Sequence, residues 1–212
     1  MWFSMILWIK KHYFQFQIML LVIFKPTVLF DKINQLKWYK GTLHQWVDDQ
    51  KFSIQSTVLE VGCASGALTA YIAESGCIPT GVDSSKRMVE LAKSNNEDVN
   101  FLVENALDLT FKDESFDAII AASLLNIVSD KDKVVSELYR TCKKGGVIST
   151  LVPSAKFKDE NLLALQTSVG ETGFSIAAMQ AWHNRAPKMK ENDILLLFTK
   201  AGLTKIRTKS YL

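Results

Sequence analysis

Two acidic residues close neighbouring apolar runs, and a loop of small residues follows the first of them. Glu60 lies in "VLEVGCASG", and Asp83 ends "CIPTGVD". Because Gly62, Ala64 and Gly66 leave the first loop almost without side chains, a ligand can approach the backbone N–H groups at the start of the next helix. A carboxylate at the position of Asp83 can accept hydrogen bonds from both hydroxyls of a ribose. The two acids and the loop predict a site for a nucleotide-like ligand.

The spacing within the loop distinguishes between cofactors. A dinucleotide-binding fingerprint reads G-x-G-x-x-G, whereas here Ala64 replaces the middle glycine and the last glycine comes one residue early. Glu60 would repel a pyrophosphate but would suit a ligand with an ammonium or sulfonium cation. S-adenosylmethionine carries both cations and no phosphate, so we expect it as the cofactor. A nicotinamide-dependent oxidoreductase is the alternative, disfavoured by Glu60 and by the glycine spacing.

The segments that must position these residues alternate between strand and helix patterns. Strand patterns cover "TVLEV", "CIPTGVD", "NFLVEN", "SFDAIIAA" and "GGVISTLV", and helical patterns cover "ALTAYIAES", "SSKRMVELAKSN" and "SDKDKVVSELYRTC". Ser129 and Asp132 have capping-box spacing at the start of the last of these helices. Strands that alternate with helices form parallel sheets with right-handed crossovers. We therefore predict an α/β fold with a doubly wound, mostly parallel sheet.

Residues after 152 follow a looser pattern. Helical periodicity in residues 159–189 is interrupted by Gly170, Gly173 and Pro187, and "KENDILLLFTKAG" then indicates a clear helix. The last segment, "LTKIRTKSYL", is predicted to be a sixth strand.

Four segments, in this order and at this spacing, resemble class I S-adenosylmethionine-dependent methyltransferases of the small-molecule type. They are "VLEVGCASG", "GVDSSKRMVELAK", "NFLVENALDLTFKDESFDAII" and "LYRTCKKGGVI". The resemblance implies a Rossmann-like methyltransferase fold, S-adenosylmethionine as cofactor and a small molecule as methyl acceptor. It also implies a cofactor site made of Glu60, Gly62, Cys63, Gly66, Asp83, Ser84, Met88, Asn105, Ala106 and Ala121.

In this resemblance Glu60, Gly62 and Gly66 line the methionine pocket, and Asp83 holds the ribose. Plainer readings stay open, because the glycines could be turn residues and Asp83 could be a helix N-cap. The family often has glycine where Ala64 stands, and a methyl group is tolerable there if φ is negative.

The remaining site residues would surround the adenine. Ser84 and Met88 would flank it, Asn105 and Ala106 would bound its amine, and Ala121 would touch the cofactor. Met88 could equally be a core residue and Asn105 a loop residue. The family often has aspartate where Asn105 stands, but an amide oxygen can still accept a hydrogen bond from the amine.

The family's sheet usually has seven strands in the order 3-2-1-4-5-7-6. Five strands through residue 152 and a sixth at the end leave no residues for a hairpin partner. We therefore expect the sheet to lack its last strand and to expose an edge.

The sequence says less about the methyl acceptor. Methyl transfer depends more on close approach than on acid–base groups, so the catalytic residue is unknown, with His183 as a weak candidate. With Trp182, Asn184 and Arg185 it forms either a substrate-binding cluster or the end of a surface helix. No metal site is expected.

The N-terminus contains the apolar runs "MWFSMILWI" and "IMLLVIF", neither of which reaches the roughly 18 residues of a spanning helix. It could be an interfacial membrane helix, a helix packed on the domain, or an extension upstream of the true start. We divide the chain into an apolar extension (1–25) and a methyltransferase domain (26–212), with a cofactor core (57–152) and a substrate-side insertion and helix (153–203). A lipophilic acceptor, met through peripheral membrane contact of residues 1–24, would fit this pattern.

Composition limits the remaining classes. The chain has 212 residues, a hydrophobic fraction of 48% and a net charge of +3, so no electrostatic case for nucleic acid exists. Three widely separated cysteines predict neither disulfides nor zinc, as expected of a reducing, cytoplasmic location with membrane association left open. A methyltransferase-like binding protein whose catalysis has lapsed is a further alternative.

Overall fold

The computed structural model describes residues 2–211, with the side chains of residues 12–25 and 27–211. The chain forms two compact units, each built from segments far apart in the sequence. We call residues 1–40 and 157–186 the helical unit, and residues 41–156 and 187–212 the sheet unit. The boundary at residue 40 falls inside helix α3 (Lys37–Asp48).

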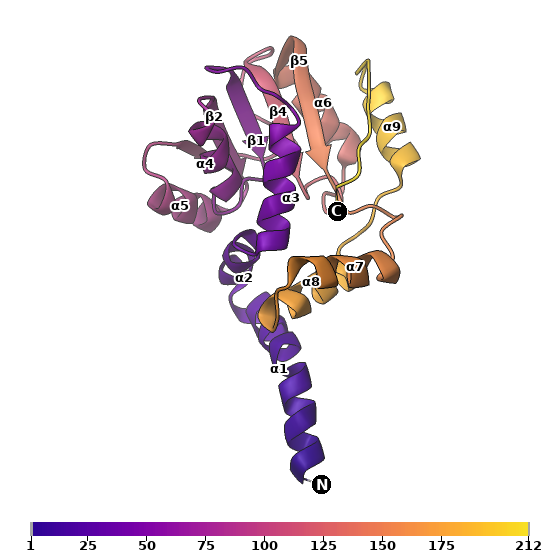
Figure 1. Cartoon of the computed structure of the whole chain (residues 1–212). Coiled ribbons are helices and arrows are strands. Elements are labelled where there is room, and N and C mark those ends of the chain that lie inside the picture. The colour runs from indigo at the N-terminus through magenta and orange to yellow at the C-terminus, as the bar shows by residue number, and fades with distance from the viewer. Residues whose placement is uncertain (1, 212) are drawn as a thin grey trace. The chain divides into compact units, whose positions relative to one another are not determined.

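A parallel sheet of five strands forms the centre of the sheet unit (Figure 1). Its strands are β1 (Thr57–Val61), β2 (Ile78–Asp83), β3 (Asn100–Val103), β4 (Phe116–Ala122) and β5 (Cys142–Leu151). They lie in the order β3-β2-β1-β4-β5, and every pair is parallel. The prediction of a doubly wound parallel sheet is thereby confirmed. Because β1 lies between β2 and β4, the loops after these three strands meet at one edge of the sheet.

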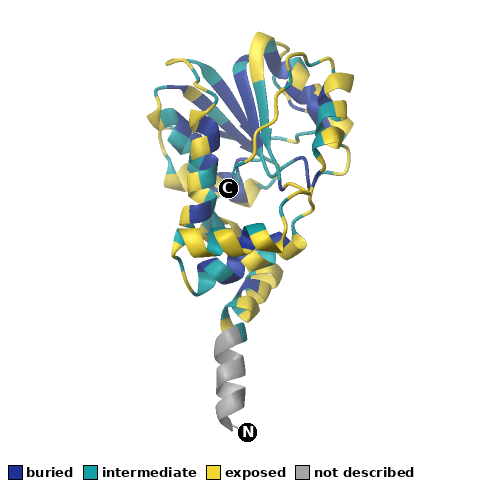
Figure 2. Cartoon of the chain, turned by 45° about the vertical axis from the view of Figure 1, so that its right-hand side comes forward, coloured by how far each residue is buried: buried dark blue, intermediate teal, exposed yellow. Residues whose placement is uncertain are grey.

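Three helices connect strands of the sheet: α4 (Ala67–Glu74), α5 (Lys86–Asn95) and α6 (Lys131–Thr141). Helix α9 (Glu191–Lys200) follows β5 in the chain and packs against α6. The Ser85 hydroxyl caps α5 by accepting from the Met88 N–H. Helix α6 begins one residue later than its predicted capping box, because Asp130 rather than Ser129 accepts from the Lys133 N–H at 2.9 Å. Buried residues concentrate in the strands and on the helix faces that touch them (Figure 2).

The predicted sixth strand is absent from the structure. Residues 203–211 run without regular secondary structure, and side chains hold them: Lys209 pairs with Asp49, and Tyr211 also binds Asp49. Residues 2–56 contribute helices and turns but no strand, so β4 is the only described partner of β5. The expectation of a sheet that lacks its last strand is therefore confirmed, but with five strands rather than six.

The helical unit is formed by α1 (Trp2–Phe24), α2 (Pro26–Asn34), α7 (Asp159–Val169), α8 (Phe174–Arg185) and the first turn of α3. One part of its core packs α1 and α2 against α8 through Ile18, Leu29 and Ala178. The other part packs Trp38 with Met179. Among the residues that the structure describes, we find no helix that combines the length and the apolar character needed to cross a bilayer.

Candidate cofactor-binding site

Asp83 joins the loops that follow β1 and β2. Its Oδ2 accepts a hydrogen bond from the Ala64 N–H at 3.1 Å, and its Oδ1 accepts from the Ser85 N–H at 2.9 Å. The strands that carry the two acids are direct neighbours, with Glu60 opposite Gly81 in the register. The structure therefore brings Glu60, the small loop and Asp83 together at the carboxyl edge of the sheet, where ligands of doubly wound folds bind.

Glu60 is a buried acid, and Thr69 donates to its carboxyl group through both the hydroxyl and the backbone N–H. Its side chain lies almost wholly out of solvent, and the Thr69 hydroxyl of α4 donates to its Oε2. Burial raises the pKa of Glu60 to about 7, and the nearby Asp83 charge adds to the rise against the opposing effect of the Thr69 hydrogen bond. A carboxyl group with this pKa would be driven to its charged form by a nearby cation.

The Cys63 thiol reports the electrostatic environment of the loop. Its pKa is raised well above the usual range, first by burial and then by the charges of Glu60 and Asp83. Both acids thus act on the middle of the loop. Such an environment favours a cationic ligand over a phosphate.

Gly62 and Gly66 both have backbones that disfavour other residues, but they face different neighbours. Their φ angles are +83° and +82°. A Cβ on Gly62 would make ordinary contact with Leu124 at 3.4 Å, whereas a Cβ on Gly66 would lie 2.6 Å from the Phe101 ring. Gly66 therefore serves close packing of α4 on the sheet, and Gly62 shapes the turn.

Ala64 does not meet the condition stated for it, because its φ is +47° rather than negative. An alanine in this left-handed region costs about 1 kcal/mol more than glycine. The hydrogen bond from the Ala64 N–H to Asp83 helps to hold the loop in this conformation.

The residues predicted around the adenine lie at the ends of β2, β3 and β4, at the same edge of the sheet. Ser84 is exposed, Met88 is buried on α5, and Ala121 is fully buried in β4. Asn105 is exposed, and its Oδ1 accepts from the Leu107 N–H at 3.0 Å, which makes it a turn residue. Ala106 is half-buried beside it. Their contacts with a cofactor stay predictions.

His183, the weak catalytic candidate, belongs to the helical unit, whereas the loop belongs to the sheet unit. It is buried near the end of α8, and its Nε2 lies 2.8 Å from Oδ1 of Asp159 in the first turn of α7. Trp182 packs edge-on against Trp38, and Asn184 and Arg185 are exposed. These contacts give His183 a structural role, and its catalytic role stays a prediction.

Two residues near the loops escaped the sequence analysis. Thr69 is a polar residue in an otherwise apolar helix segment, which is a signal that could have linked it to Glu60. Asn126 lies in the turn after β4, next to residues that pack on the loop, since Leu124 faces Gly62. Asn126 is 7% exposed, and no donor among the described residues reaches its buried Oδ1. A buried amide oxygen that no protein donor reaches is costly unless a water or a ligand donates to it.

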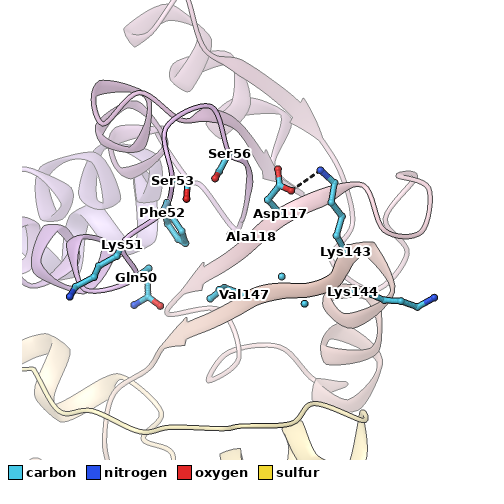
Figure 3. Close-up of a pocket in the computed structure, with 12 residues that line it drawn as sticks. Gln50, Lys51, Phe52, Ser53, Ser56, Asp117, Ala118, Lys143, Lys144 and Val147 are labelled. Carbon is cyan, nitrogen blue, oxygen red and sulfur yellow. Dashed lines mark hydrogen bonds and ion pairs between the residues drawn. The ribbon is translucent and has the colours of Figure 1, made fainter.

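The sheet unit also contains a hollow of about 360 Å³ at the amino ends of β4 and β5 (Figure 3). It is lined by Gln50, Lys51, Phe52, Ser53, Ser56, Asp117, Ala118, Lys143, Lys144, Gly145, Gly146 and Val147. The Lys143 ammonium pairs with Asp117 at 2.7 Å and holds the pKa of that carboxyl far below its usual range. In a parallel sheet this is the edge opposite the carboxyl ends, so the hollow is not part of the cofactor site.

Comparison with known proteins agrees with this geometry. Residues 59–150 match the family described as a methyltransferase domain. Phosphatidylethanolamine N-methyltransferase of Cereibacter sphaeroides is 34% identical over 97 residues, which are 43% of this chain and 47% of that protein. Ubiquinone biosynthesis O-methyltransferase of Coxiella burnetii is 31% identical over 105 residues, 48% of this chain and 45% of its own. Demethylmenaquinone methyltransferase of Tropheryma whipplei is 36% identical over 92 residues, 42% of this chain and 38% of its own. The matches span less than half the length of these relatives.

Solved structures match over more of the chain. An S-adenosylmethionine-dependent methyltransferase from Aquifex aeolicus has a TM-score of 0.63 at 17% identity, covering 87% of this chain and 91% of its own. One from Thermotoga maritima has a TM-score of 0.62 at 22% identity, covering 83% and 76%. At these identities the structures show the fold. Residues 59–150 therefore match the methyltransferase-domain family, and the chain has the class I fold that is found in S-adenosylmethionine-dependent methyltransferases.

Proposed function

We propose that this protein binds S-adenosylmethionine at the loops after β1 and β2 and transfers a methyl group to a small, lipophilic molecule. The observation that carries the proposal is that two carboxyl groups, the buried Glu60 and the Asp83 that accepts from the Ala64 N–H, lie at the same loop on neighbouring strands. Sulfonium and ammonium cations are stabilised there, whereas the pyrophosphate of a nicotinamide cofactor would be repelled.

The residues at this edge have the donor and acceptor chemistry that the cofactor needs. Each carboxylate oxygen of Asp83 already accepts one N–H, and a carboxylate offers about four acceptor positions, so two remain for ribose hydroxyls. Glu60 would balance the cationic methionine part. Met88 and Ala106 would supply apolar surface for the adenine. The bound cofactor supplies an electrophilic methyl group, and the chain's part is to orient it and to exclude water.

A lipophilic acceptor is supported by the names of the relatives. Those relatives act, by name, on a phospholipid or in the biosynthesis of ubiquinone and menaquinone. The apolar helix α1 points in the same direction, and we propose that it lets a cytoplasmic protein make peripheral membrane contact through residues 1–24. The division into an extension of residues 1–25 and a domain of residues 26–212, and a catalytic role for His183, are part of the same proposal.

Calorimetric titration tests the choice of cofactor. We expect the protein to bind S-adenosylmethionine and not NAD. Asp83→Asn keeps one acceptor oxygen for the Ala64 N–H, gives up the bond from the Ser85 N–H and removes the charge. We expect it to weaken binding by about 10-fold or more, as for a hydrogen bond to a charged group. Asp98→Asn, at an exposed position outside the site, is the matched control. Binding of NAD in place of S-adenosylmethionine would establish the oxidoreductase alternative instead.

A methyl-transfer assay tests the activity. The acceptor panel consists of demethylated quinones, phosphatidylethanolamine and water-soluble amines and phenols, with labelled S-adenosylmethionine as donor. We expect transfer to at least one of the lipophilic acceptors. Tight cofactor binding without transfer to any acceptor would favour the lapsed binding protein, and transfer to the water-soluble compounds alone would contradict a lipophilic substrate.

A further inference from the structure

One face of α1 and the start of α2 leave large apolar side chains in solvent. Phe24 is 70% exposed, Ile23 59%, Phe16 55% and Phe30 50%. A contiguous apolar patch of this kind on the surface of a folded protein commonly marks a site of interaction with another protein or a membrane. We call the exposed side chains Tyr13, Phe16, Leu20, Ile23, Phe24 and Phe30 the α1–α2 surface.

The spacing in α1 places these residues on one stripe. Phe16, Leu20 and Ile23 follow Tyr13 at intervals of three, seven and ten residues, which is one face of a helix. The opposite face, with Ile18 at its centre, packs on α8 and α2 inside the helical unit. Helix α1 is thus apolar on both sides, and the unit covers only one of them.

The charge of this segment identifies the kind of surface that would cover the other side. Residues 1–40 contain six lysines and one aspartate, a net charge of +5, although the whole chain carries only +3. Residues 1–40 are thus strongly basic, whereas the rest of the chain has a slightly negative net charge. Lys25, which follows Phe24 in the sequence, is exposed, as are Lys32 and Lys40 farther along the same segment, and the Lys32 ammonium lies 5.8 Å from the centre of the Phe174 ring. Apolar side chains flanked by lysines match the interface of a membrane that contains anionic lipids.

We propose that the α1–α2 surface docks in the interface of an anionic phospholipid membrane, with the helix lying along the membrane rather than across it. A second copy of the chain is a poorer partner, because self-pairing would bring two strongly basic segments together. This inference deepens the proposed function by naming the residues and the lipid of the membrane contact. It rests on the proposed function only in that a protein with a lipophilic acceptor would meet that acceptor at a membrane. Membrane docking itself needs neither cofactor nor acceptor.

Vesicle flotation in the absence of S-adenosylmethionine tests the proposal, because aggregated protein sinks whereas vesicle-bound protein rises. We expect the whole protein to float with phosphatidylcholine vesicles containing phosphatidylglycerol, and about 10-fold less with phosphatidylcholine alone. Each lysine near an anionic surface contributes about fivefold in affinity. High salt should reduce flotation, because the Debye length falls from about 10 Å at 0.1 M to about 3 Å at 1 M.

Substitutions locate the surface. The double variant Ile23→Ser with Phe24→Ser should lose flotation by about 10-fold or more, as two exposed apolar side chains are withdrawn from the lipid. Leu163→Ser in α7 and Leu196→Ser in α9 remove equally exposed apolar residues elsewhere, at 65% and 70% exposure, and should float like the unaltered protein. Circular dichroism confirms that each variant is folded.

Each other outcome contradicts the proposal. Undiminished flotation of the double variant would show that another surface binds the lipid. No flotation, with a dimer that the double variant converts to a monomer, would assign the surface to a second copy. Methyl transfer to a lipophilic acceptor without flotation would separate the two ideas: the proposed cofactor binding and methyl transfer would stand, and the docking surface would be refuted together with the membrane contact of residues 1–24.

Discussion

Glu60 shows how one buried carboxyl can respond to both pH and ligand. Its pKa of about 7 lies above that of a glutamate in an unfolded chain, near 4.5. The folded protein therefore holds a proton on this group between about pH 4.5 and 7 that the unfolded chain has lost. The stabilisation from this proton is fully present below about pH 4.5 and is lost as pH rises through about 7. A bound cation acts in the opposite direction, because it favours the charged carboxylate.

The variant Glu60→Gln tests both effects. We expect the wild-type free energy of unfolding to lose on the order of 3 kcal/mol from Glu60 between about pH 4.5 and pH 8, and the variant to lack this loss. Affinity of the wild type for S-adenosylmethionine should rise as pH increases through about 7, with proton release on binding. Urea unfolding and calorimetry across this pH range measure the two slopes. Glu97→Gln, at an exposed position, should behave like the wild type, and a pH-independent affinity in the wild type would contradict the role of Glu60.

Asn126 offers a test of whether a buried polar group serves a ligand rather than stability. Because its buried Oδ1 has no donor among the described residues, replacing the amide by an apolar group of similar size should not cost stability. We expect Asn126→Leu to leave the unfolding free energy unchanged or raise it by about 1–2 kcal/mol, while methyl transfer falls at least 10-fold. Asn192→Leu on the exposed face of α9 is the control. Full activity in Asn126→Leu would show that no ligand uses this oxygen.

At the level of elements, the ring of a single phenylalanine packs directly against two glycines. A Cβ on Gly66 would lie 2.6 Å from the Phe101 ring and 2.9 Å from the Ala92 Cβ, and a Cβ on Gly81 would lie 2.7 Å from the same ring. Phe101 in β3 therefore fills the space that both glycines leave open. The close approach of α4 to the sheet, which sets the position of the loop, depends on this packing.

Gly66→Ala and Gly145→Ala together measure that packing. Both glycines have φ near +80°, but a Cβ on Gly145 would meet no heavy atom within 4 Å. Gly145→Ala should cost about 1 kcal/mol for the backbone alone, and Gly66→Ala should cost about 2–4 kcal/mol because overpacking is added. Denaturant unfolding gives the difference. Equal losses of stability in the two variants would show that Phe101 moves aside freely. Adding Phe101→Leu to Gly66→Ala should restore part of the lost unfolding free energy only if the ring is the obstacle.

The elements were predictable where their pattern is local. The apolar runs of β1 and β4 and the periodic helices α5 and α6 appear in the structure because a two- or 3.6-residue period decides which face is buried. The prediction of a strand in the final segment was wrong for a non-local reason. "LTKIRTKSYL" alternates like a strand, but an edge strand also needs a partner backbone, and Lys209 and Tyr211 bind Asp49 instead. The conformation of Ala64 also depends on a distant partner, the Asp83 carboxylate.

At the level of the whole molecule, the loop was easier to predict than the arrangement of the rest. Glu60, Gly62 and Asp83 could be placed from sequence, because the carboxyl ends of parallel strands meet at one edge. Nothing in residues 1–40 predicts that they form a unit with residues 157–186, since that pairing depends on contacts between segments far apart in the chain. Asn126 could not be identified from the sequence either, because only the folded structure shows which amide oxygen lacks a donor.

Cofactor binding should be visible in the unfolding of the whole chain. All the residues that we assign to the cofactor lie in the sheet unit, so S-adenosylmethionine should stabilise the transition in which that unit unfolds. At a free concentration of about 100 times Kd, ligand linkage adds about 2.7 kcal/mol. In a protein of this size that is a rise in Tm of about 5–10 °C. Differential scanning calorimetry measures it, with NAD expected to give no rise and Asp83→Asn a smaller one. If the two units unfold in separate transitions, the cofactor should move only the transition that Gly66→Ala also moves. A rise confined to the other transition would place the cofactor in the helical unit and contradict the site.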